Sequence, residues 1–297
     1  MSNQTSTPIA VNTDICSGVG SPELALRAIS EGGFTHLHWC HQWCTDFLYS
    51  THELKQYKEW FSQLNLKLLD IHGSQGQEKC WNATEEYRRK AGVELVVNRL
   101  EMMDYLEGTG SLMMHAPCIR DGFTQEQIAE ARKGHEALRR SLDELMPVLE
   151  KYDACIAIEN MPGDSFEMIA AIMKDYPAKR IGITYDSGHG HIGADKGMDN
   201  IEALKDRLQA LHLHDNNGSG DQHQPPFFGT LDWQRLAKII KTSSYAATGR
   251  PLSYEIAMVN TPFFQKGLET QPYEAMVQFT KDAHERMMKV QAIYENL

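Results

Sequence analysis

The chain has 297 residues and a formal net charge of −11 at pH 7, with 29 Lys and Arg residues against 40 Asp and Glu residues. This charge and the absence of basic clusters argue against a nucleic-acid partner, because such binding depends on neutralising phosphates. The first residues lack the basic-then-apolar pattern of a signal peptide, and no apolar stretch approaches the roughly 20 residues of a membrane-spanning helix. We therefore expect a cytoplasmic protein with no membrane partner.

The length favours one domain over residues 1–297. A (β/α)8 barrel commonly needs about 250 residues, and no low-complexity linker or change in composition divides the chain. The six cysteines show no CxxC spacing, which favours reduced thiols. Three of them, Cys16, Cys40 and Cys118, fall near predicted strand ends, where a thiol could line a pocket.

Apolar strand-like segments alternate with amphipathic helical segments, which predicts βαβ units and a parallel sheet. In chain order, the expected strands are 9–14, 34–39, 67–72, 111–117, 154–160, 180–186, 209–215 and 251–256. The helices that follow them are expected at 21–30, 50–64, 83–106, 124–151, 165–175, 200–207, 232–242 and 272–295. Eight such pairs, without a GxGxxG turn or a P-loop, predict an α/β protein with a single (β/α)8 TIM barrel rather than an open doubly wound sheet.

The longest predicted loop, residues 216–229, follows the seventh strand and is rich in Asn, Gly, Gln and Pro. Loops of this length in a compact domain are usually functional or disordered. The presence of Asp221 and His223 in this loop favours a function.

Most predicted strands end on side chains that can bind a metal ion. These side chains are Asp70, His72, His115, Glu159, Asp186, His212, His214 and Glu255. Parallel strands are buried on both faces, and buried carboxylates and imidazoles are costly unless they are paired or coordinated. TIM barrels place their active sites at the C-terminal ends of the strands. The pattern therefore predicts a ring of ligands at that end of the barrel.

Strand alternation assigns these ligands to the barrel interior. Glu159 shares its face with Ala157, whereas Ile156 and Ile158 face the helices. The same alternation places three more ligands inside the barrel: Asp186, His212 and Glu255. Three carboxylates and one imidazole form a mainly oxygen-donor site. We expect a divalent metal ion, with Mn²⁺ as the first expectation and Mg²⁺, Co²⁺ or Zn²⁺ as alternatives.

Five sequence strings resemble the xylose isomerase-like TIM barrel superfamily. They are IAIEN around Glu159, YDSGH from Tyr185 to His189, LHLHDN from Leu211 to Asn216, DQH with the later GTLDW, and LSYEI around Glu255. The resemblance covers nearly the whole chain. That superfamily includes sugar isomerases and epimerases, inosose dehydratases and endonuclease IV-type apurinic endonucleases, so the resemblance implies the barrel and leaves the activity open.

For an epimerase-type site, the resemblance implies four metal ligands: Glu159, Asp186, His212 and Glu255. It also implies that His189 contacts the substrate and that the two glutamates transfer protons. The endonuclease pattern implies a trinuclear zinc cluster with five further ligands: His72, His115, His189, Asp221 and His223. All of these positions are filled in this chain.

The favoured hypothesis is an isomerase or epimerase acting on a ketose or keto-polyol, a small-molecule carbohydrate. A divalent metal would polarise the carbonyl, and Glu159 and Glu255 would transfer protons on opposite sides of the sugar through an enediolate. An inosose-type dehydratase would share the first step and then lose a hydroxyl group. An apurinic endonuclease-like phosphodiesterase is a further alternative, opposed by the negative charge, and a non-catalytic sugar- or protein-binding barrel is another.

Several side chains near the predicted strand ends are expected to contact the substrate. They are His38, Trp43, His72, His115, His189, Asp221 and His223. The Trp43 ring could stack on the apolar face of a sugar, as could Phe227, Phe228, Phe263 and Phe264. Both His38 and His41 are either substrate contacts or structural residues, and parity assigns Trp39 to the core. The oligomeric state stays open, with a homo-oligomer among the alternatives.

Overall fold

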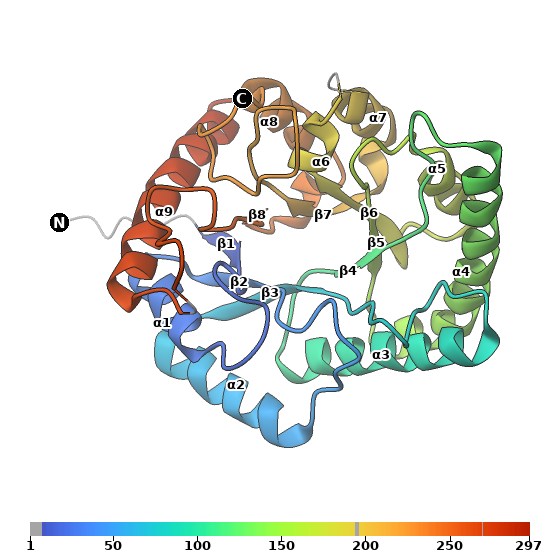
Figure 1. Ribbon diagram of the computed structural model, residues 1–297, viewed down its shortest axis with the longest axis horizontal. Helices are drawn as coiled ribbons and strands as arrows, with labels where there is room; N and C mark the ends of the chain where they lie inside the picture. The colour runs from blue at the N-terminus through green and yellow to red at the C-terminus, as the bar shows by residue number, and fades with distance from the viewer. Residues whose placement is uncertain (1–7, 194–195, 269) are drawn as a thin grey trace.

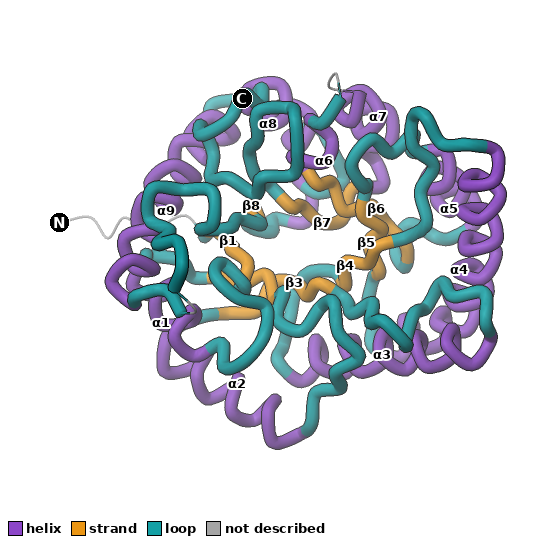
Figure 2. The backbone as a smooth tube through the Cα atoms, in the orientation of Figure 1, coloured by secondary structure: helices purple, strands orange, loops and turns teal. Residues whose placement is uncertain are grey.

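The computed structural model describes residues 8–193, 196–268 and 270–297. Eight parallel strands form an inner ring, and helices surround it (Figure 1). The strands follow the order β7-β6-β5-β4-β3-β2-β1-β8 around the ring. The ring closes where Leu213, just after β7, pairs in parallel with Tyr254 of β8. The predicted (β/α)8 TIM barrel is confirmed, and Figure 2 shows its two layers as strands inside and helices outside.

The strands are β1 (Ile9–Asn12), β2 (His36–Trp39), β3 (Lys67–His72), β4 (Leu112–His115), β5 (Ile156–Glu159), β6 (Ile181–Asp186), β7 (Leu208–His212) and β8 (Leu252–Tyr254). The α-helices are α1 (Glu23–Glu31), α2 (Thr51–Leu64), α3 (Glu86–Tyr105), α4 (Gln125–Lys151), α5 (Glu167–Asp175), α6 (Ser187–His191), α7 (Lys196–Leu204), α8 (Trp233–Lys241) and α9 (Tyr273–Glu295). Two short 3₁₀ helices are η1 (Lys205–Arg207) and η2 (Ala246–Thr248).

The largest differences from the predicted elements follow β6. The short helix α6 was not predicted, and α7 begins at Lys196, ahead of the expected start at residue 200. Glycines explain both differences. A Cβ atom at Gly197 would lie 2.3 Å from the Cα of Gly190, so the close packing of α6 on α7 requires residues without side chains. The same glycines weaken the sequence signal for a helix.

The main apolar core lies between the strands and the helices. Ile156 and Ile158 of β5 are fully buried in this core, as the alternation predicted. Trp39 of β2 belongs to it too, and its indole donates a hydrogen bond to the Tyr49 hydroxyl at 2.9 Å. Apolar residues therefore fill the outer face of the strands, which leaves the inner face at their carboxyl ends to polar side chains.

All six cysteines are free, as the scattered spacing predicted. Among the helices of the described residues, none has the length and apolar character needed to cross a membrane. The expectation that the first residues differ from a signal peptide rests in part on residues 1–7. These lie outside the described residues.

Candidate active site

Four of the predicted ligands meet at the carboxyl ends of β5 to β8. Glu159, Asp186 and His212 are the last residues of their strands, and Glu255 directly follows β8. One ligand atom from each lies within 4.8 Å of those of the other three, and all four side chains are buried. We call these four residues the central group.

Within the central group, one imidazole connects the two glutamates. His212 Nδ1 lies 2.9 Å from Glu159 Oε1 and 2.8 Å from Glu255 Oε2. Burial lowers the pKa of His212, but the charges of Glu255 and Glu159 outweigh burial and raise that pKa well above its usual value. Burial raises the pKa of both glutamates, but the charge of His212 holds both values well below their usual range. The two glutamates are therefore ionised in the metal-free protein.

The donor set of the central group fits a divalent cation. The group itself holds three buried carboxylates and a single imidazole. Further imidazoles lie against two of these carboxylates, His115 on Glu159 and His214 on Asp186. Buried charges are costly without compensation, and oxygen-rich donor sets with one imidazole suit ions such as Mn²⁺, Mg²⁺, Co²⁺ and Zn²⁺. A divalent ion would supply positive charge to these carboxylates.

His214 holds Asp186 in place. Its Nε2 lies 2.9 Å from Asp186 Oδ1 and 3.1 Å from Oδ2. Gly188 makes room for this contact, because a Cβ atom there would lie 1.9 Å from the His214 ring. From the sequence, His214 was expected only as one of the metal-capable side chains at the strand ends. The structure makes it a positioning residue for a candidate ligand, and such partners commonly orient metal-binding side chains.

A second group consists of His72, His115 and Glu159, whose ligand atoms also lie within 4.8 Å of one another. His115 Nε2 lies 2.9 Å from Glu159 Oε2. The His72 Nδ1–H donates to the Gly73 carbonyl at 3.0 Å, which leaves Nε2 as its acceptor nitrogen. Burial holds the pKa of His72 well below its usual value. The half-buried Trp43 ring contacts both imidazoles, tilted against His72 at 4.5 Å and edge-on to His115 at 5.4 Å between ring centroids.

A third group consists of His189, Asp221 and His223. The Nε2 atoms of both histidines lie 3.1 Å from Asp221 Oδ2. The His189 Nδ1–H donates to the Asn160 carbonyl at 2.9 Å. Burial lowers the pKa of both histidines, but nearby carboxylates, Asp221 above all for His223, raise both values to about 10. The structure thus gathers all the ligand positions implied by the family resemblance into three adjoining groups.

Asp215 anchors the long loop after β7. This residue is 1% exposed, and its carboxylate accepts four hydrogen bonds. The donors are the backbone N–H groups of Asn216, Phe227 and Leu231 and the indole N–H of Trp233. The loop carries Asp221 and His223, so this buried carboxylate fixes the part of the chain that supplies the third group. Nothing in the sequence pattern singled out Asp215 for this role.

Of the other expected substrate contacts, one lies beside the central group and several contact other parts of the protein instead. The His38 ring centroid lies 4.3 Å from that of His212, beside the central group. By contrast, His41 Nε2 donates to the Gly20 carbonyl at 2.7 Å, as a structural residue would. The loop phenylalanines have partners of their own, because the Arg286 guanidinium lies 4.1 Å from the Phe228 ring and Phe263 packs edge-on against Phe279.

A cavity of about 230 Å³ opens beside His189. Its lining mixes apolar residues and glycines with polar side chains, which include Asp121, Asn160, Asp164, His189, Lys196 and Asn200. Pockets of this kind fix a ligand through a small number of polar groups. The cavity therefore suits a small ligand with several hydrogen-bonding groups.

Comparison with known proteins places this barrel in a family. A family model described as xylose isomerase-like TIM barrel matches residues 26–282. The uncharacterised protein y4fM of Sinorhizobium fredii is 27% identical over 256 residues, which cover 79% of this chain and 80% of that protein. A D-tagatose 3-epimerase-like protein has a similar structure, with a TM-score of 0.71, 20% identity and coverage of 97% of this chain and 98% of that one. D-psicose 3-epimerase shares the fold as well, with a TM-score of 0.70 and 14% identity. The match covers 95% of this chain and 99% of that one. The chain belongs to the xylose isomerase-like TIM barrel family.

Proposed function

We propose that the protein is a divalent-metal-dependent sugar isomerase or epimerase acting on a ketose or keto-polyol. The observation that carries this proposal is the central group, in which Glu159 and Glu255 approach one imidazole from separate strands. The names of the structurally similar D-tagatose 3-epimerase-like protein and D-psicose 3-epimerase support a ketose substrate. Mn²⁺ is the first expected ion, with Mg²⁺, Co²⁺ and Zn²⁺ as alternatives.

The two glutamates carry the chemistry in this proposal. A divalent cation in the central group would polarise the substrate carbonyl and ease removal of the proton on the neighbouring carbon. One glutamate, as a carboxylate, then removes that proton, which leaves an enediolate. The other glutamate takes up a proton from solvent and donates it to the opposite face, and the first glutamate afterwards releases its proton to solvent. Because Glu159 and Glu255 are buried and their pKa values lie well below the usual range, either can act as the base.

The surrounding groups orient the sugar. Trp43 offers a ring face to the apolar side of a carbohydrate. The substrate hydroxyl groups find donors and acceptors on His72, His115, His189, Asp221 and His223. The negative net charge agrees with a neutral carbohydrate rather than a polyanion, and the cavity beside His189 offers polar side chains to such a ligand.

The test is exchange of substrate hydrogen with deuterated water. Mn²⁺-loaded protein is incubated with ketoses, inososes and keto-glycosides, and deuterium at the carbon beside the carbonyl is measured. Exchange is expected for the wild type and lost in Glu255→Gln, which keeps the side-chain shape but cannot accept the proton. A matched control is Glu130→Gln on α4, an exposed carboxylate paired with Lys133, which should exchange as the wild type does.

Four outcomes decide the proposal. Exchange without loss of mass supports an isomerase or epimerase, whereas loss of one water molecule from the product identifies the dehydratase alternative. Full activity in Glu255→Gln refutes the proton-transfer role of that glutamate. Absence of exchange on every substrate by metal-loaded wild type refutes the sugar activity.

A second candidate is a phosphodiesterase of the apurinic-endonuclease type. The observation that favours it is the presence of three adjoining ligand groups, enough for three zinc ions. The net charge of −11 opposes it. Close to three equivalents of bound Zn²⁺ together with cleavage of DNA at apurinic sites would favour this candidate, and one equivalent of Mn²⁺ or Co²⁺ in the central group without cleavage would favour the sugar enzyme.

A further inference from the structure

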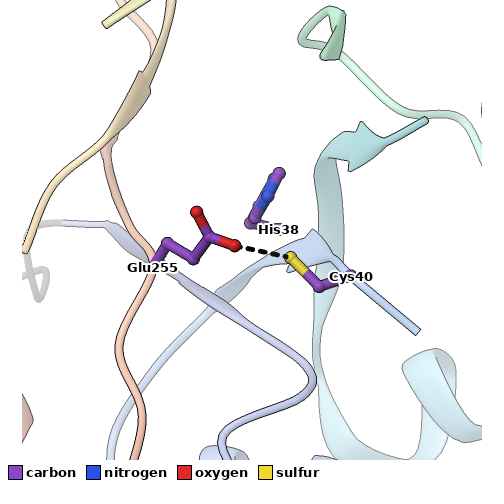
Figure 3. Close-up of side chains that lie close together, drawn as sticks. All are labelled: His38, Cys40 and Glu255. Carbon is purple, nitrogen blue, oxygen red and sulfur yellow. Dashed lines mark hydrogen bonds between the residues drawn. The ribbon is translucent and has the colours of Figure 1, made fainter. Parts of the chain in front are cut away.

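His38, Cys40 and Glu255 form a fourth group of metal-capable side chains beside the central group. A ring nitrogen of His38, Cys40 Sγ and a carboxylate oxygen of Glu255 lie within 4.8 Å of one another, and all three residues are buried. Figure 3 shows the Cys40 sulfur facing the Glu255 carboxylate, with the His38 ring next to both. Among the four groups found in the described residues, this one alone contains a thiol.

The barrel brings this group together across its closure. His38 and Cys40 are two residues apart at the end of β2, so both side chains point to the interior. Glu255 comes from the end of β8, and Asn12 of β1 lies between the two strands. The Asn12 side chain donates to the Ile256 carbonyl at 3.0 Å and accepts from the Ile256 N–H at 2.8 Å. This amide clamp fixes the backbone next to Glu255.

The His38 imidazole is already oriented as a metal ligand. Its Nδ1 lies 2.8 Å from Asp70 Oδ1, and this buried carboxylate accepts the Nδ1–H. The Nε2 atom is then left with its lone pair. His38 is 0% exposed, and Nε2 has no hydrogen-bond partner in the described part of the chain. A carboxylate on the far nitrogen of a ligating imidazole is a general feature of zinc sites, and buried polar atoms are rarely left without a partner.

The Glu255 carboxylate faces two groups at once. Its Oε2 lies 2.8 Å from His212 Nδ1 in the central group, whereas its Oε1 lies 3.8 Å from Cys40 Sγ. Around a tetrahedral Zn²⁺ ion, a thiolate sulfur and a carboxylate oxygen are about 3.6 Å apart. The observed separation needs only a small adjustment to hold an ion, and the two oxygens are arranged as in a carboxylate that bridges two metals.

Without a cation, Cys40 is a thiol. Burial, together with the charges of Asp14, Glu255 and Asp70, raises the pKa of Cys40 well above its usual value, and its S–H donates to Glu255 Oε1 at 3.8 Å. A thiolate at this position therefore requires a positive partner such as a metal ion. A donor set of sulfur, nitrogen and oxygen suits Zn²⁺ or Co²⁺, whereas Mg²⁺ and Mn²⁺ prefer oxygen.

We propose that His38 Nε2, Cys40 Sγ and Glu255 Oε1 bind a thiophilic divalent cation of the Zn²⁺ type, separate from the ion of the central group and joined to it through Glu255. Binding converts the thiol to a thiolate and releases its proton to solvent. The site does not depend on the sugar chemistry proposed above.

The test uses Co²⁺ as the probe, added to the metal-free chain. A thiolate ligand produces a sulfur-to-cobalt charge-transfer band in the near ultraviolet, and this band reports the thiol-containing group alone. We expect the band in the wild type and its loss in Cys40→Ser, with one equivalent of Co²⁺ fewer bound. The matched control is Cys155→Ser, because Cys155 is also buried but precedes β5 and belongs to none of the four groups.

A second variant keeps the test decisive if Cys40→Ser does not fold. Asp70→Asn leaves every proposed ligand in place but weakens the orientation of His38, so it should lower Co²⁺ affinity at this site 10- to 100-fold and retain the band at saturation. The absence of the band in the wild type, or its persistence in folded Cys40→Ser, overturns the proposal. Failure of substrate deuterium exchange with the band intact counts only against the sugar activity.

Discussion

The His214 imidazole reaches both oxygens of Asp186, at 2.9 and 3.1 Å from Nε2. If this contact orients a metal ligand, His214→Phe should lower metal affinity at the central group 10- to 100-fold, because an aromatic ring is kept while the hydrogen bond to Asp186 is lost. Calorimetric titration with Mn²⁺ measures the effect. The control is His284→Phe, whose imidazole packs edge-on against Phe34. Unchanged Mn²⁺ affinity in His214→Phe would remove the positioning role.

Gly188→Ala tests the same contact by steric pressure. The added methyl group would lie 1.9 Å from His214 Cε1, so the imidazole must move. We expect weaker Mn²⁺ binding and a loss of about 1–3 kcal/mol in the free energy of unfolding. Gly220→Ala is the control, since no atom lies within 4 Å of a Cβ there. In the double variant with His214→Ala the stability loss should be less than the sum of the two single losses. Strict additivity would show that the methyl group disturbs something else.

Asp215→Ala should destabilise the protein more than an ordinary surface change. Four hydrogen-bond donors lose their acceptor, and buried unsatisfied donors are expensive. We expect a loss of about 3 kcal/mol or more in the free energy of unfolding, measured in urea. The control is Asp232→Ala, which removes the N-cap of α8 and should cost about 1 kcal/mol. Equal losses in the two variants would show that the loop does not depend on Asp215.

Asp164→Asn should stabilise the protein at neutral pH. Burial raises the pKa of Asp164 to about 6, while its carboxylate accepts the Phe166 N–H at 2.8 Å, a bond that asparagine can keep. Because the folded-state pKa lies above the unfolded value near 4, ionisation opposes folding. Wild-type stability attributable to this group is therefore present below about pH 4 and is lost as the pH rises through about 6. The variant should gain up to about 3 kcal/mol at pH 7 and almost nothing at pH 4.

Urea unfolding at several pH values measures this gain, and Asp153→Asn provides a control of opposite sign. Hydrogen bonds from Lys179 and Arg180 lower the pKa of Asp153, so ionisation of that residue favours the folded state. Its variant should lose stability at neutral pH. A pH-independent difference between Asp164→Asn and the wild type would contradict the burial argument.

The barrel and its inward ligands could be predicted because they follow from local rules. Alternation alone separates Glu159 and Ala157 from Ile156 and Ile158, and the structure buries all four as expected. The partners of His214 and Asp215 could not be predicted in this way. Each depends on a turn that follows a strand, where glycine-permitted packing and a buried carboxylate decide the path of the chain.

Contacts between residues far apart in the sequence could not be predicted from the sequence pattern either. Cys40 was placed near a strand end, but its contact with Glu255, 215 residues away, exists only after the barrel closes. Helix α6 was missed because two of its five residues are glycines, and its presence sets the position of His189.

The pairing of Leu213 with Tyr254 completes the ring at the point that delivers Glu255. A nascent polypeptide without the eighth strand therefore lacks Glu255. This residue belongs both to the central group and to the group of His38, Cys40 and Glu255. If these groups bind ions as proposed, an ion that needs Glu255 can bind only after synthesis has passed the eighth strand.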